Sequence, residues 1–166
     1  MDESNGLKQK IVETAIESLR SEGLRFSVDT LAARLKISKK TVYKHFPDKE
    51  ALAYAVYETY YAAATAQIAQ IAAGGDAQLR LLLLYRDAGR MICREIFNKY
   101  KLNDSVYAYA AERHEALWGE ILLRLAPAAS PADAAVLRAI VDGAFEKSAV
   151  YGASMERTAE ILTRVL

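Results

Sequence analysis

The chain has 166 residues, of which 52% are hydrophobic and 26% are charged, and its formal net charge at pH 7 is only +1. This composition predicts a folded protein with a packed core and excludes global disorder, and the length suits one sizeable domain or two small ones. The single cysteine, Cys93, excludes an internal disulfide and is typical of a protein in a reducing cytosol.

The sequence contains no segment typical of an exported or membrane-spanning protein. The first residues are acidic and lack an apolar run, so we expect no signal peptide. The most apolar stretch, residues 51–73, is interrupted by Glu58, Gln67 and Gln70, which makes it too polar to cross a membrane. We therefore expect a cytoplasmic protein with no membrane partner.

The first element along the chain is a helix predicted over residues 7–22. Apolar residues recur there at three- and four-residue steps, which gives the helix one apolar face. Gly23 follows as a signal for the end of the helix. We expect this helix to support the elements that follow it.

Two short helices are predicted next, each with one apolar edge. Ser27 and Ser38 precede them as N-caps, and residues 35–38 form the tight turn between them. Pro47 ends the second short helix, and Asp48 caps the helix after it. Two short helices joined by a tight turn are the helix-turn-helix pattern.

Longer helices are predicted for the rest of the chain. Gly74 and Gly75 interrupt them, Ser130 and Ser154 are N-caps, and Pro131 suits a first helical position. We therefore predict an all-α protein with two domains, a three-helix domain at residues 1–48 and a helical domain at residues 49–166. The expected helices of the second domain span residues 49–73, 77–101, 106–125, 131–151 and 154–166.

The positive charge of the chain is concentrated on the helix-turn-helix. Residues 34–49 contain six basic side chains and one acid, a net charge of +5, whereas the whole chain carries +1. A basic surface on a near-neutral protein is the electrostatic footprint of a DNA-binding surface. The alternatives are a solvated charged face, or a protein-interaction module whose basic residues bind an acidic partner.

The same segment resembles the recognition-helix signature of the TetR family of bacterial transcription regulators, and the resemblance extends over roughly residues 7–56. Lys40 departs from the signature, because the family often has Gly or Pro at that position. The residues that carry the resemblance are Ser38, Lys39, Lys40, Thr41, Val42, Tyr43, Lys44, His45, Phe46 and Lys49.

The resemblance implies a homodimer that binds a palindromic double-stranded DNA operator, and a small-molecule effector that lowers the affinity for DNA. Repression is the commoner outcome in this family. Its members dimerise through the last two long helices, which here correspond to residues 131–151 and 154–166. Ala135, Ala139, Gly143 and Ala144 are small residues that would let helices approach closely. The last helix is short for the family.

Candidate binding residues follow from these expectations. Tyr43, His45 and Lys49 match family positions that hold the DNA backbone. Lys39, Lys40, Thr41 and Lys44 face the groove and are placed to read base edges. For the effector, we consider a set of aromatic and thiol side chains, although aromatic residues in a core look the same from sequence. This set consists of Tyr57, Tyr61, Tyr85, Cys93, Tyr107 and Trp118.

Enzymatic chemistry is not indicated. His114 and Glu115 begin like a zinc-peptidase pattern, but the second histidine is missing. Cys93 and His114 would need a fixed distance and an oxyanion-type loop to act as a nucleophile pair. There is no Gly-rich phosphate loop and no Cys/His cluster, so we expect no catalytic residue, no metal site and no cofactor. The identity of the effector, the operator and the choice between repressor and activator do not follow from the sequence.

Overall fold

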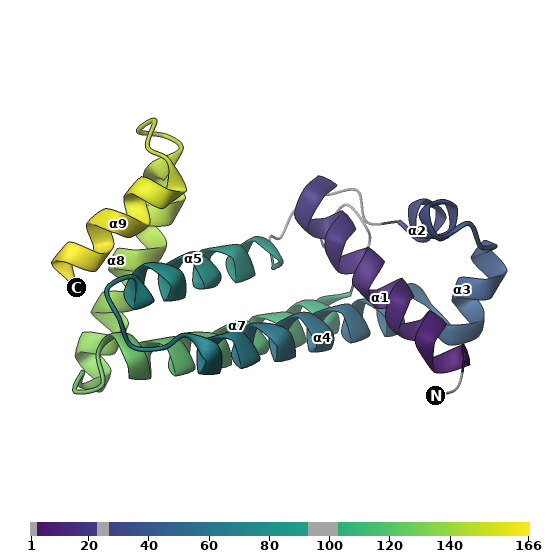
Figure 1. Ribbon diagram of the computed structural model, residues 1–166, viewed down its shortest axis with the longest axis horizontal. Coiled ribbons are helices and arrows are strands. Elements are labelled where there is room, and N and C mark those ends of the chain that lie inside the picture. Colours follow the sequence, from purple (N-terminus) through teal and green to yellow (C-terminus); the bar gives the residue numbers. More distant parts are fainter. Residues whose placement is uncertain (1–2, 23–26, 93–102) are drawn as a thin grey trace. The chain divides into compact units, whose positions relative to one another are not determined.

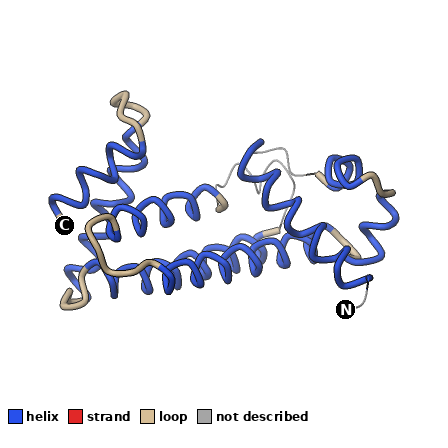
Figure 2. Tube along the Cα trace, viewed as in Figure 1, coloured by secondary structure: helices blue, strands red, loops and turns tan. Residues whose placement is uncertain are grey.

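All the secondary structure in the described part of the chain is helical. The computed structural model describes residues 3–22, 27–92 and 103–166, and it contains eight helices and no strand within these ranges (Figure 2). The all-α prediction is therefore confirmed. The helices are α1 (Glu3–Glu22), α2 (Val28–Leu35), α3 (Lys39–His45), α4 (Lys49–Gln70), α5 (Ala77–Arg90), α7 (Asp104–Leu125), α8 (Pro131–Ser148) and α9 (Met155–Val165).

The chain forms two compact units. The first contains Met1–Ala63 and Arg90–His114, and the second contains Ala64–Gly89 and Glu115–Leu166. The division passes through α4 and α7, so each of these helices contributes residues to both units. This division describes compactness rather than function, and the expected boundary at residue 48 stays a prediction.

Local hydrogen bonds explain where the short helices of the first unit begin. Ser27 Oγ and Ser38 Oγ each accept a hydrogen bond of 3.0 Å from the backbone N–H three residues later. Asp48 Oδ1 accepts one of 2.7 Å in the same way at the start of α4. These caps satisfy N–H groups that have no partner inside the helix. The predicted helix-turn-helix is confirmed, with α2 and α3 following α1 in Figure 1.

The turn between α2 and α3 contains an unusual backbone conformation. Lys36, which ends α2, has φ 54° and ψ 39°, in the left-handed region. Among the described residues it is the only non-glycine with a positive φ. Its backbone N–H donates to carbonyls at the end of α2, which is how helices commonly end, although glycine is the usual residue there.

Aliphatic and aromatic side chains from α1 to α4 form the core of the helix-turn-helix region. Packing of α1 against α2 and of α2 against α3 brings these side chains together. The fully or nearly fully buried residues are Ile11, Val12, Ala15, Leu31, Val42, Phe46 and Leu52.

The second unit contains α5, α8 and α9 with parts of α4 and α7. Ser130 and Asp133 form a reciprocal capping box at the start of α8, where Pro131 is the first helical residue. The last two helices pack against each other, and the hydroxyls of Ser148 and Thr158 lie 2.7 Å apart.

Several helices end earlier than predicted. In place of a helix over residues 77–101, α5 ends at Arg90, directly after Gly89, and residues 91–92 form a turn. Glycine weakens a helix, and this explains an end here. Residues 93–101 of the predicted helix lie outside the described residues. The predicted helix over residues 131–151 ends at Ser148, and Gly152 with φ 69° completes the reversal.

No helix in the described ranges combines the length and the apolar character that a membrane span requires.

Candidate functional site

The second helix of the helix-turn-helix, α3, has two different edges. On one edge Val42 is fully buried, and Phe46 just after the helix is nearly so. On the other edge Lys39, Lys40 and Lys44 are exposed. The apolar edge anchors α3 to the core, and the basic edge is left for a negatively charged partner.

The other predicted DNA contacts are more enclosed. Thr41, Tyr43 and His45 are half-buried, whereas Lys49 at the start of α4 is exposed. The Thr41 hydroxyl lies 2.8 Å from Ser38 Oγ, so it takes part in the cap at the start of α3. The structure thus gathers the seven predicted residues on α3 and the first turn of α4, and their individual roles stay predictions.

One of the exposed lysines is paired within the protein. Lys39 Nζ lies 3.0 Å and 3.1 Å from the two carboxylate oxygens of Asp29 in α2. The hydrogen bond to Asp29 raises the pKa of Lys39, and the attraction of the two charges adds to this effect. Sequence reasoning assigned Asp29 no contact with Lys39, because the two residues are ten positions apart.

A further polar contact joins α1 to α2. Arg34 Nη1 donates a hydrogen bond of 2.8 Å to Ser18 Oγ, and Ser18 is fully buried. One of the basic residues counted with the DNA-binding surface therefore also helps to hold α2 against α1.

The predicted effector residues fall into separate groups. Tyr57, Tyr61 and Tyr107 belong to the first unit, whereas Tyr85 and Trp118 belong to the second. In the first unit, the buried Tyr57 hydroxyl donates a hydrogen bond of 2.9 Å to the Met91 carbonyl. Tyr61 is also buried and makes an edge contact with the ring of Tyr60, and burial raises its pKa. Tyr107 is half-buried, and Cys93 lies outside the described residues.

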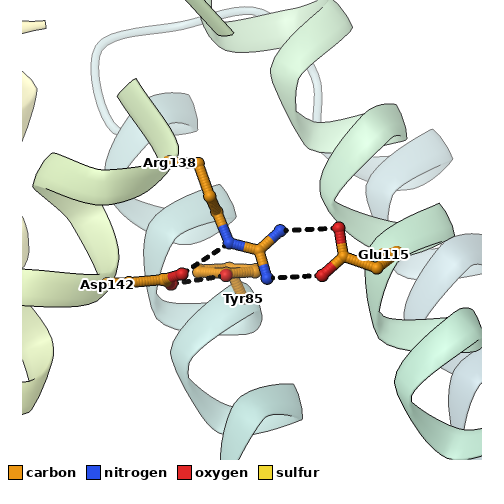
Figure 3. Close-up of polar contacts among 4 residues, drawn as sticks. All are labelled: Tyr85, Glu115, Arg138 and Asp142. Atoms are coloured by element: carbon orange, nitrogen blue, oxygen red, sulfur yellow. Dashed lines mark hydrogen bonds and ion pairs between the residues drawn. The ribbon is translucent and has the colours of Figure 1, made fainter. Parts of the chain in front are cut away.

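In the second unit, Tyr85 and Trp118 are brought together around Arg138. Figure 3 shows Tyr85 and Arg138 with Glu115 and Asp142, the two carboxylates that bind the guanidinium. The two ring centroids are 4.8 Å apart, and the guanidinium carbon lies 5.0 Å and 5.3 Å from them. Arg138 also donates to Glu115 and to Asp142, with shortest distances of 2.8 Å and 2.6 Å. Tyr85 completes the group by donating a 2.6 Å hydrogen bond to Asp142.

Sequence reasoning missed the three charged members of this group. Arg138 and Asp142 are four residues apart on a helix, a spacing that allows an ion pair and was a usable signal. Glu115 is 23 positions from Arg138, and no local pattern connects them. Among the described residues, no three His, Cys, Asp or Glu side chains are grouped so that they would hold a metal ion.

A capped helix-turn-helix with a basic exposed edge is typical of a DNA-binding protein, and comparison with known proteins agrees for this part of the chain. Residues 11–56 match the family model described as "Bacterial regulatory proteins, tetR family". This segment is therefore similar to regulators of the TetR family, and the chain is a DNA-binding transcriptional regulator rather than an enzyme.

A solved structure is similar over nearly the whole chain. It is a predicted transcriptional regulator from Saccharomonospora viridis, crystallised in complex with choline. The likeness has a TM-score of 0.69 and covers 96% of this chain and 95% of the other, at 18% sequence identity. At this identity the likeness shows a shared fold. No curated protein sequence matches the chain.

Proposed function

We propose that this chain is a ligand-responsive repressor that binds a palindromic operator as a homodimer in the cytoplasm. The observation that carries the DNA-binding part is the division of α3 into a buried apolar edge and an exposed basic edge. A dimer with one such helix per subunit places two copies of α3 in successive major grooves, so bound sites are expected to be inverted repeats with centres about 34–36 Å apart.

Exposed aliphatic side chains on the last two helices support a homodimer. Val136 and Ile140 of α8 and Ile161 and Val165 of α9 are all exposed. Each pair is four residues apart and so lies along one face of its helix. Covering aliphatic surface is favourable, and a second copy of the same helices would cover it.

Aromatic side chains in the second unit, together with the comparisons, support a small-molecule effector. Tyr85 and Trp118 are large, mostly buried and close to polar groups, a combination typical of ligand sites. A protein of the same fold was solved with a small molecule bound. An effector that prefers a conformation with weak DNA affinity would relieve repression, with a coupling of about 5- to 150-fold.

Selection of bound DNA from a random pool tests this function. Inverted repeats with the expected spacing support a dimeric operator-binding protein. Recovery of sites without two-fold symmetry contradicts it. Binding that depends little on salt and shows no sequence preference favours the alternative, in which the basic surface binds an acidic protein.

Analytical ultracentrifugation tests the proposed dimer separately. Ile140→Asp and Ile161→Asp place charges on the proposed interface, and they are expected to shift the protein towards monomer. Leu123→Asp changes a more exposed aliphatic residue on α7, at 65% against 45% for Ile140 and 46% for Ile161, and serves as the control. Equal effects of all three substitutions would contradict an interface on α8 and α9.

A further inference from the structure

The Arg138 side chain covers an aromatic pair in the second unit. The Tyr85 and Trp118 residues are only 3% and 7% exposed, and their planes are tilted by 53°. The guanidinium lies over both rings at 5.0 Å and 5.3 Å, within the range of a cation–π interaction. The two rings thus already hold one cation, the Arg138 guanidinium, which the protein itself supplies.

Two carboxylates surround this cation. Glu115 binds the guanidinium through two contacts of 2.8 Å and 3.3 Å, and Asp142 binds it at 2.6 Å. Burial raises the pKa of Tyr85, and its hydrogen bond to Asp142 raises it further, so the phenol stays neutral. Two acids against one base leave the group with a surplus of one negative charge, which favours an added cation.

The internal cation is held mainly by partners that water also reaches. The side chains of Glu115 and Asp142 are 66% and 48% exposed, whereas that of Arg138 is 20% exposed. Because both carboxylates reach water, they stay solvated when the guanidinium leaves, so its departure leaves no buried unpaired charge. In such an exchange the long Arg138 side chain would move its guanidinium to solvent, while the two buried rings would keep their places.

We propose that this group is a binding site for a small organic cation with an apolar surface, such as a quaternary ammonium, which takes the place of the Arg138 guanidinium. The inference rests on the proposed ligand-responsive function and gives the chemical class of its effector. A quaternary ammonium has no N–H to donate, so it needs what this site offers: two aromatic faces and a negative field. Its binding breaks the link that Arg138 makes from α8 to Glu115 of α7.

Trp118 makes the site directly observable, because it is the only tryptophan in the chain. Tetramethylammonium chloride is titrated into the full-length protein at constant ionic strength while tryptophan fluorescence is recorded. We expect a saturable change in the wild type. Neutral tert-butanol, which has a similar size and shape, controls for apolar volume, and sodium chloride controls for salt.

Variants of the charged residues distinguish exchange from simple addition. Arg138→Ala and Arg138→Gln remove the internal competitor, so both are expected to bind tetramethylammonium more tightly than the wild type. If Arg138 leaves the rings about a tenth of the time, the gain is about tenfold. Glu115→Gln and Asp142→Asn are expected to weaken binding. Circular dichroism and thermal melting establish whether each variant is folded. If Arg138→Ala does not fold, the comparison with the wild type is made with Arg138→Gln.

Four results would overturn the inference. The first is that neither the wild type nor the Arg138 variants show a saturable change, and the second is that a folded Arg138 variant binds tetramethylammonium more weakly than the wild type. The third is an equal response to tert-butanol, and the fourth is a response to phosphatidylcholine vesicles but not to free tetramethylammonium. The last would mean that the site takes a lipid headgroup rather than a free small molecule. The titration contains no DNA, so its failure is distinct from a failure of operator binding, which the selection experiment measures.

Discussion

Asp29→Asn is expected to increase the affinity of the protein for DNA of any sequence. In the free protein, both carboxylate oxygens of Asp29 contact the Lys39 ammonium, which lies on the exposed basic edge of α3. A phosphate must compete with this carboxylate for the same ammonium group. Removing the negative charge releases Lys39 and also removes a repulsion between α2 and the DNA backbone.

The size of the effect follows from counterion release. Each phosphate contact contributes about −0.9 to the slope of log K against log salt concentration. If Lys39 gains one phosphate, the slope becomes steeper by about one unit, and raising the salt from about 50 to about 200 mM weakens the variant about 3.5-fold more than the wild type. Fluorescence anisotropy with a labelled duplex of arbitrary sequence measures both slopes without knowledge of the operator.

The Lys39→Ala background tests whether Asp29 acts through Lys39. In that background Asp29→Asn should change the salt slope little, because the released ammonium group is absent. Glu58→Gln removes a carboxylate from an exposed position on α4 and controls for the change in net charge. The reasoning is refuted if Asp29→Asn leaves the slope unchanged, or if it has the same effect with and without Lys39.

Further predictions concern both binding and stability. Lys49→Ala should weaken binding to all sequences alike, whereas Lys44→Ala should change which sequences are preferred. Selection from a random pool distinguishes the two effects, and an unchanged sequence preference in Lys44→Ala would show that Lys44 does not read bases. Lys36→Gly should raise the melting temperature by about 2–4 °C, since glycine relieves about 1 kcal/mol of left-handed strain. Lys36→Ala keeps the Cβ atom and should give no such rise. Equal melting temperatures of the two variants would show that the Lys36 backbone is not strained. Asp133→Asn should lower the melting temperature at pH 7, because hydrogen bonds from Ser130 hold the pKa of Asp133 below its ordinary value of 3.8. This stabilisation is present above that value and is lost as the pH falls through the lower pKa of the folded state, so melting curves of the two proteins should converge in acid, and a constant difference would exclude the carboxylate as its source. Tyr61→Ala should reduce the free energy of unfolding by about 3–5 kcal/mol, because its ring is buried; denaturant titration measures this, and a loss below about 1 kcal/mol would show that the ring is not part of the core.

The starts of the helices could be read from the sequence because an N-cap is a local interaction. Ser27, Ser38, Asp48 and Ser154 each accept a hydrogen bond from a backbone N–H three residues ahead, as their positions suggested. The ends were harder to predict. The helix expected over residues 77–101 ends at Arg90, directly after Gly89. A helix can continue past a glycine where tertiary packing supports it, so the glycine alone did not allow this end to be predicted.

The candidate sites show the same difference between local and distant information. The basic edge of α3 was visible because its lysines are neighbours in sequence. The pairing of Lys39 with Asp29, and that of Arg138 with Glu115, join different helices and depend on how those helices pack. No spacing rule connects residues 23 positions apart, so the charged half of the Tyr85–Trp118 group became visible only in three dimensions.

The brevity of α3 has a consequence for how such a protein can diverge. A seven-residue helix is too short to be stable alone, since isolated helices below about 12–15 residues are marginal in water. It is therefore held by its cap and by two buried side chains, Val42 and Phe46. The exposed lysines at positions 40 and 44 contribute little to that support, because exposed substitutions usually change stability by less than about 0.5 kcal/mol. If these lysines read base edges as proposed, a lineage can exchange them one at a time and acquire a new operator while every intermediate still folds.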